Sequence, residues 1–172
     1  MSRSERGVGL AEAVVVTGLV ALIVSAAGVG ALNWLRAEKQ RSAAYQTYGQ
    51  MTLARVEATK RNRSCRFTLD TATRRLRVLD LNDPGTSSDD QEISSTALDS
   101  SVTFGRPDTG AAITLPLQSG TTYFVTYRAD GTLESAGGTI GLSNPVFRRV
   151  TASAGGVVML ERWTGSVWVA GS

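Results

Sequence analysis

Few residues of this sequence could carry out chemistry. The 172 residues include no histidine, which excludes Ser-His-Asp and Cys-His catalysis and removes the commonest zinc ligand. The single cysteine, Cys65, cannot form an intramolecular disulfide, and we expect a buried apolar side chain rather than a nucleophile. Ser94-Ser95 and Asp89-Asp90 have neither a histidine partner nor the spacing of metal ligands. The sequence therefore predicts no catalytic residue, no metal site, no cofactor and no enzyme activity.

One carboxylate is unusual because of its surroundings. Glu12 is the only charged residue among the 28 positions from Val8 to Leu35. Since about 20 apolar residues cross a bilayer, residues 8–35 are predicted to form a transmembrane helix. A charge at the centre of such a segment costs about 2.5–3.5 kcal/mol and by default indicates a function. Arg3 and Arg6 precede the segment, so the positive-inside rule predicts a cytoplasmic N-terminus.

Two simpler interpretations of the apolar segment stay open. Val24-Ser25-Ala26 offers a small-residue site at which a secretory signal peptide could be cleaved from a soluble β domain. The apolar region of a signal peptide is usually about 7–15 residues long, however, and this one is longer and carries a carboxylate near its start. A plain single-pass anchor explains the length of the segment but leaves Glu12 unexplained.

The run Gly7-Val8-Gly9-Leu10-Ala11-Glu12 resembles the processing site of type IV pilin-like prepilins. Val8 stands where phenylalanine is more usual, and Gly9 where Thr or Ser is usual. The resemblance implies that residues 1–7 are a leader, that prepilin peptidase cleaves after Gly7, and that Val8 becomes N-methylated. Glu12 lies about one helical turn from the new amine. In a filament, its carboxylate could then pair with the Val8 amine of a neighbouring subunit and set the register of assembly.

The element that must carry these residues is a long helix. No proline occurs before Pro84, so a helix can run from Val8 to about Lys60 without a forced kink. Residues 8–35 would form its apolar half and residues 36–62 an amphipathic continuation. The amphipathic half is predicted to pack against the rest of the chain through a stripe of apolar side chains, namely Ala44, Tyr48, Met51 and Val56.

Residues 63–172 are predicted to form a β-rich globular head. Cys65–Leu69 and Arg75–Leu79 alternate like strands and flank a turn at Asp70–Thr73. Residues 82–95 form a polar stretch that predicts a loop. The other predicted strands are Ser101–Phe104, Ala112–Leu115, Thr121–Tyr127, Thr139–Leu142, Phe147–Ala152 and Val157–Arg162, followed by a hairpin at Trp163–Trp168. The fold class is thus α+β, a long helix packed on an antiparallel sheet.

Three further stretches, one at the end of the helix and two in the head, extend the resemblance to the GspH/FimT family, the H-type pseudopilins of type II secretion and related minor type IV pilins. The stretch from Ala54 to Asn62 is similar to the end of the family's long helix, Tyr127–Thr132 to its aspartate-glycine turn, and Gly138–Ile140 to the strand that follows. Such a chain would be a structural subunit that helps to initiate or cap a filament. It would lie in the bacterial inner membrane as a single-pass protein, with an extracytoplasmic head and other pilin subunits as partners.

Nucleic-acid binding is the alternative that the charges leave open. The net charge of +3 conceals eleven Lys/Arg against three Asp/Glu in residues 36–77, and six acidic residues with no basic one in residues 78–104. Some minor pilins of the family bind DNA through a C-terminal glycine-arginine-x-arginine motif, and the stretch Gly155–Val158 lacks both arginines. DNA is therefore the less favoured partner. The basic residues that could still contact phosphates are Lys60, Arg61, Arg63, Arg148 and Arg149.

Overall fold

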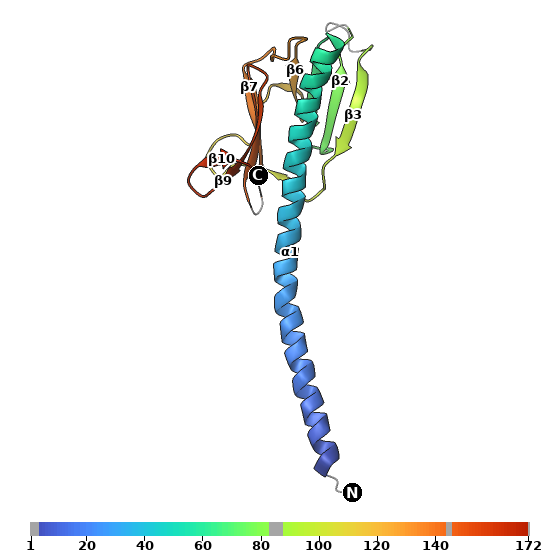
Figure 1. Cartoon of the computed structure of the whole chain (residues 1–172), viewed down its shortest axis with the longest axis vertical. Helices are drawn as coiled ribbons and strands as arrows, with labels where there is room; N and C mark the ends of the chain where they lie inside the picture. Colours follow the sequence, from blue (N-terminus) through green and yellow to red (C-terminus); the bar gives the residue numbers. More distant parts are fainter. Residues whose placement is uncertain (1–3, 83–87, 144–145, 172) are drawn as a thin grey trace. The chain divides into compact units, whose positions relative to one another are not determined.

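The computed structural model describes residues 4–82, 88–143 and 146–171, except the side chains of residues 4–8, 10 and 24–29 (Figure 1). The chain divides into two compact units, residues 1–36 and 37–172. A single helix, α1 (Ser4–Arg61), contributes to both. Part of the predicted leader and part of the predicted 82–95 loop lie outside the described residues.

The predicted helix is confirmed, although it begins at Ser4, within the predicted leader, and not at Val8. Its C-terminal end has a clear physical cause. Asn62 adopts a left-handed conformation with φ of 53°. The amide of Arg63 donates to the carbonyl of Ala58 at 3.1 Å, and the amide of Asn62 donates to that of Thr59 at 3.3 Å. These two bonds form a Schellman motif, which satisfies carbonyl groups that the last turn leaves open. Among the described residues, no helix is long and apolar enough to cross a membrane.

The described part of residues 37–172 contains two antiparallel sheets of five strands each, shown with the helix in Figure 1. The first sheet has the order β3 (Gln91–Ala97), β2 (Arg75–Asp80), β1 (Cys65–Asp70), β6 (Thr122–Tyr127) and β5 (Leu117–Ser119). The second has the order β10 (Trp168–Ala170), β9 (Val158–Trp163), β8 (Arg148–Ser153), β7 (Gly137–Ser143) and β4 (Thr103–Phe104). The predicted hairpins at Asp70–Thr73 and Trp163–Trp168 are both confirmed.

Two predicted elements differ from the structure. Ala112–Leu115 forms no strand, and only Ile113 bridges to Ile140 of β7. The reason is that β4 occupies part of the same edge of β7, so each segment makes only a few pairs. The predicted 82–95 loop overlaps β3, an edge strand with mostly exposed and half-buried side chains. Because Ile93 is the only large apolar side chain of β3 and packs only partly against the core, the sequence lacks the alternation that identifies a strand.

One hydrophobic core joins the helix to both sheets. The buried face of α1 is formed by Gln40, Ala43, Ala44, Thr47, Met51, Ala54 and Ala58. Against it pack Phe67 and Val125 of the first sheet and Ile140 and Val150 of the second. Burial of Ala44 and Met51 and partial burial of Tyr48 confirm the predicted stripe.

Val56 was wrongly assigned to that stripe, because its side chain is 50% exposed. At about 100° per residue, position 56 is rotated well away from position 44 around the helix. Ala54 and Ala58 continue the buried face instead.

Candidate functional site

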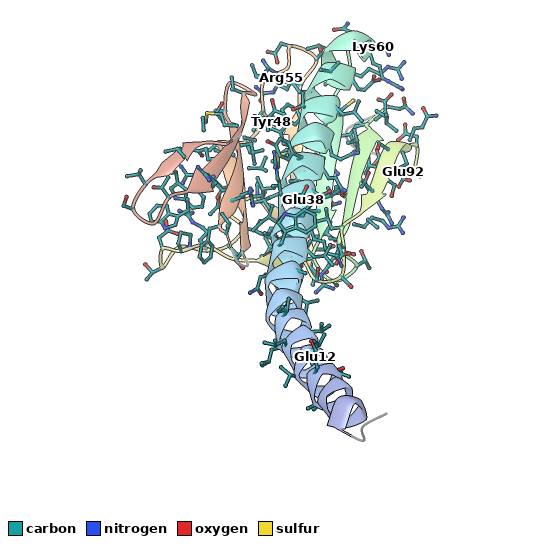
Figure 2. All side chains as sticks on the ribbon, turned by 60° about the horizontal axis from the view of Figure 1, so that its bottom comes forward. Glu12, Glu38, Tyr48, Arg55, Lys60 and Glu92 are labelled. Carbon is teal, nitrogen blue, oxygen red and sulfur yellow. The ribbon has the colours of Figure 1, made fainter. Side chains whose placement is uncertain are left out.

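The first candidate site surrounds Glu12 on α1, within residues 1–36. The Glu12 side chain is exposed (Figure 2), as are the large apolar side chains that follow it, Val14, Val15, Val16, Leu19 and Val20. Successive exposed positions leave this stretch without a polar face. Gly7 and Val8 belong to the same helix, but their side chains lie outside those described. The arrangement therefore offers one carboxylate within an unburied apolar surface.

A second cluster lies where α1 ends. Arg61 Nε donates to Glu57 Oε2 at 2.7 Å, and Arg61 Nη1 donates to Asp80 Oδ2 at 2.9 Å. Lys60 Nζ lies 3.3 Å from Glu57 Oε1. These contacts, the hydrogen bond from Arg61 first, lower the pKa of Glu57, and the same carboxylates raise the pKa of Arg61. The network ties the helix end to β2, since Asp80 is the last residue of that strand.

The glycine turns of the sequence meet at the same part of the helix. Gly131 and Gly156 both have φ of 78°, a conformation that favours glycine. A Cβ on Gly156 would overlap the carbonyl oxygen of Gly131, and a Cβ on Gly131 would lie 3.1 Å from Thr59 Cγ2 and 3.4 Å from Arg55 Nε. The stretches that carry the resemblance at 54–62 and 127–132 thus contact each other and the β8–β9 turn. Their shared role is backbone packing, not the cradling of a ligand.

The basic residues considered for nucleic acid do not form one free patch. Lys60 and Arg61 contact Glu57, and Arg63 Nη1 donates to Asn82 Oδ1 at 2.6 Å. Arg148 and Arg149 lie on β8 and, as neighbours in a strand, point to opposite faces of the second sheet.

Arg149 already has partners within the head. It forms two hydrogen bonds with Glu161, at 2.6 and 3.0 Å, and its guanidinium stacks 4.4 Å from the centre of the Trp168 ring. Trp168 in turn packs against Trp163, with ring centroids 5.3 Å apart. A phosphate would have to compete with Glu161 for this arginine.

Cys65 is buried in the core, as predicted. Burial raises the pKa of its thiol to about 11, and the charge of Asp80 adds to that rise. At neutral pH the thiol stays protonated and is a poor nucleophile. Among the described residues, no group of three His, Cys, Asp or Glu side chains could hold a metal.

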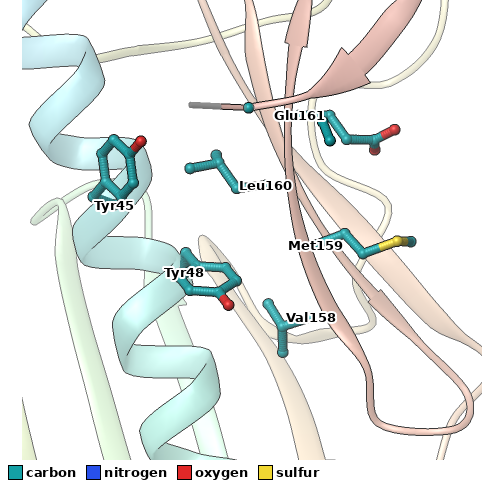
Figure 3. A pocket seen from close by; sticks show the side chains of 8 residues that line it. Tyr45, Tyr48, Val158, Met159, Leu160 and Glu161 are labelled. Carbon is teal, nitrogen blue, oxygen red and sulfur yellow. The ribbon is translucent and has the colours of Figure 1, made fainter.

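A groove of about 430 Å³ lies between α1 and the second sheet. Figure 3 shows the rings of Tyr45 and Tyr48 opposite Leu160 and Val158. Ala170 and Gly171 complete the lining from the end of the chain. This groove could not be predicted from the sequence. The apolar run Val157–Leu160 indicates a strand but not its distance from the helix.

Comparison with known proteins assigns the fold. Residues 43–156 match the family described as Type II transport protein GspH. The chain belongs to the GspH family of pilin-like proteins. The match begins on the buried face of α1 and ends at Gly156, so it includes the helix end and both glycine turns. The α+β fold and the family resemblance predicted from the sequence are thereby confirmed.

Two solved structures share the fold of this GspH-family chain. The minor pseudopilin EpsH from the type 2 secretion system of Vibrio cholerae is 19% identical, with a TM-score of 0.53 over 71% of this chain and 95% of EpsH. The type IV minor pilin FimU of Pseudomonas aeruginosa is 18% identical, with a TM-score of 0.52 over 74% of this chain and 92% of FimU. No curated protein matches the sequence significantly.

Proposed function

We propose that this chain is a minor pilin or pseudopilin, a non-enzymatic subunit that helps to initiate or cap a filament of a type II secretion system or a type IV pilus. Prepilin peptidase would cleave after Gly7, and Val8 would become N-methylated. Residues 8–35 would anchor the subunit in the bacterial inner membrane, with the N-terminus cytoplasmic and residues 37–172 on the other side. Other pilin or pseudopilin subunits would be its partners.

The observation that carries this proposal is the surface around Glu12. Large apolar side chains follow it at exposed positions, and Trp34 near the end of the segment is 68% exposed. An apolar surface of this kind is stable only inside a membrane or against other subunits. A carboxylate there needs a cationic partner, because an unpaired charge in an apolar environment is costly. The amine of a processed Val8 on a neighbouring subunit would supply that partner.

Mass spectrometry of the membrane-extracted protein tests the processing step. We expect a chain that begins at N-methylated Val8, and uncleaved precursor for Gly7→Glu. A chain that begins near Ala27 would instead establish a signal peptide and a secreted soluble domain. A wild-type chain that still begins at Met1 would indicate an unprocessed single-pass membrane anchor instead of a prepilin.

Glu12 tests the assembly step. Glu12→Ala makes the segment more apolar, so insertion into the membrane should be at least as efficient as in the wild type. Loss of one partner of a buried ion pair typically costs about 3–5 kcal/mol, so recovery in sheared or cross-linked filaments should fall sharply. Glu12→Asp keeps the negative charge on a shorter side chain, so part of the recovery in filaments should remain. Thr17→Val, one and a half turns further along, is the matched control and should assemble normally.

The Glu12 experiment has two results that would contradict the mechanism. Normal recovery of Glu12→Ala in filaments would exclude the charge pair. Its disappearance from the membrane fraction would place the role of Glu12 in insertion or processing.

DNA uptake is the second candidate, motivated by the five basic residues considered above. Glu57 and Asp80 already form ion pairs with Arg61, and Glu161 does so with Arg149. We therefore expect weak DNA binding that is independent of DNA sequence and falls steeply with salt. Tight binding at physiological salt that is abolished by Arg148→Gln with Arg149→Gln would favour a DNA receptor over a filament initiator.

A further inference from the structure

Three arginines lie together where α1 faces the second sheet. Arg148 of β8 and Arg162 of β9 are directly paired across the two strands, so their side chains leave the same face of the sheet. Val150, also on that face of β8, is buried in the core under α1. Arg41 of α1 is close enough to perturb Arg148 electrostatically and lies 5.7 Å from the centre of the Tyr45 ring.

These arginines lack the carboxylates that neutralise comparable residues of the head. Arg149 and Arg61 each form a short ion pair with a glutamate. Among the described residues, no carboxylate lies within ion-pair distance of Arg41, Arg148 or Arg162.

Arg148 has the least favourable surroundings of the three arginines. Its Nη1 atom is buried and has no hydrogen-bond partner among the described residues. Burial, and then the charges of Arg41 and Arg162, lower the pKa of Arg148, while Tyr45 and Glu38 oppose the effect only in part. Like charges directly opposite each other destabilise a sheet, and a buried donor without an acceptor adds to that cost. An external anion with several acceptor oxygens would relieve both effects.

We propose that Arg41, Arg148 and Arg162 bind the phosphate of an anionic phospholipid headgroup. A guanidinium can pair with phosphate through two parallel hydrogen bonds, and the two anionic oxygens of a phospholipid phosphodiester can accept hydrogen bonds from more than one guanidinium. A lipid is favoured over a soluble anion as the source of the phosphate because Arg41 is close in sequence to the proposed membrane segment. Arg41 is only six positions after Leu35, the end of that apolar segment. Arg36 adds positive charge over the same positions, whereas Lys39 is paired with Asp99 at 3.1 Å. The inference rests on the proposed membrane anchoring of residues 8–35.

The test compares lipids on the full chain by native mass spectrometry from detergent micelles. Phosphatidylglycerol and phosphatidylcholine with identical acyl chains are supplied in equal amounts, and the ratio of their adducts is measured. A basic residue near an anionic surface contributes a factor of about five in affinity, equivalent to about 1 kcal/mol. We therefore expect a preference for phosphatidylglycerol that falls roughly 25-fold in Arg148→Gln with Arg162→Gln. The control, Arg75→Gln with Arg128→Gln, removes two exposed charges and should keep the preference.

Three results would overturn the inference. Equal adducts of the two lipids in the wild type would exclude a preference for an anionic headgroup. An equal loss in the control variant would show that only net charge matters. Displacement of phosphatidylglycerol by an equal concentration of inorganic phosphate or of a short DNA duplex would assign the cluster to a soluble anion or to nucleic acid. A chain that takes up neither lipid and does not enter bilayers would contradict the proposed function itself, whereas loss of the preference alone would not.

Discussion

Gly155 and Gly156 are adjacent in one turn, but substitutions at the two positions should have opposite effects. Gly156→Ala places a side chain at φ of 78°, where a left-handed conformation costs about 1–2 kcal/mol. The new Cβ would also overlap the Gly131 carbonyl oxygen, a backbone atom that can move only with its turn. Overpacking of this kind costs about 1–3 kcal/mol. Together these terms predict a loss of about 2–5 kcal/mol in the free energy of unfolding.

Gly155→Ala is the matched control for this prediction. A Cβ at Gly155 meets no atom within 4 Å, and Gly155 has no positive φ. Because alanine restricts the unfolded chain, the variant should be unchanged or more stable by up to about 1 kcal/mol.

Urea unfolding of the full chain, followed by the fluorescence of Trp163 and Trp168, measures both variants. A Trp34→Phe background removes the signal from residues 1–36. If Gly156→Ala unfolds within about 0.5 kcal/mol of the parent, the range of ordinary surface substitutions, the contact between the two turns does not hold the head together.

Three further expectations concern the head. A fragment that starts at Arg36 should be soluble and β-rich by circular dichroism, and a mainly helical spectrum would contradict the fold. Cys65 should react with a thiol reagent only after unfolding, because it is buried with a pKa of about 11, and rapid labelling of the native protein at neutral pH would refute this. Hydrogen bonds, first from Thr73 and Thr121, lower the pKa of Asp70 to about 2, so its contribution to stability is complete above the unfolded value of about 3.9 and is lost as pH falls through 2. Asp70→Asn should therefore flatten the acid side of the stability profile, and an unchanged profile would exclude this role.

The sequence predicted the elements that carry strong local patterns. The long helix, the hairpin of β1 and β2, and the burial of Cys65 follow from periodicity and residue type alone. The polar strand β3 did not, because an edge strand with a single large apolar side chain, Ile93, has no alternation to detect. Val56 was misplaced because an apolar residue can lie outside the buried stripe when alanines continue it.

The candidate sites divide in the same way. Glu12 could be predicted because a charge within an apolar run is apparent from the sequence alone. The pairing of Arg61 with both Glu57 and Asp80 joins residues 19 positions apart and depends on how the helix end meets β2. The opposition of Arg148 and Arg162 depends on strand register. Neither register nor distance between elements is encoded in the local spacing of residues.

The order of strands in the first sheet restricts when the head can fold. The central strand β1 has β2 as one neighbour, which follows it at once, but its other neighbour is β6, where Cys65 pairs with Tyr127. The buried face of α1 also needs Val150 and Ala152 of β8, about a hundred residues later in the chain. During synthesis, Met51 and its neighbours on the helix therefore stay uncovered until most of the chain has emerged. Such late, long-range closure makes the unfinished chain prone to aggregation, so a chaperone that binds amphipathic helices would protect it most before β8 arrives.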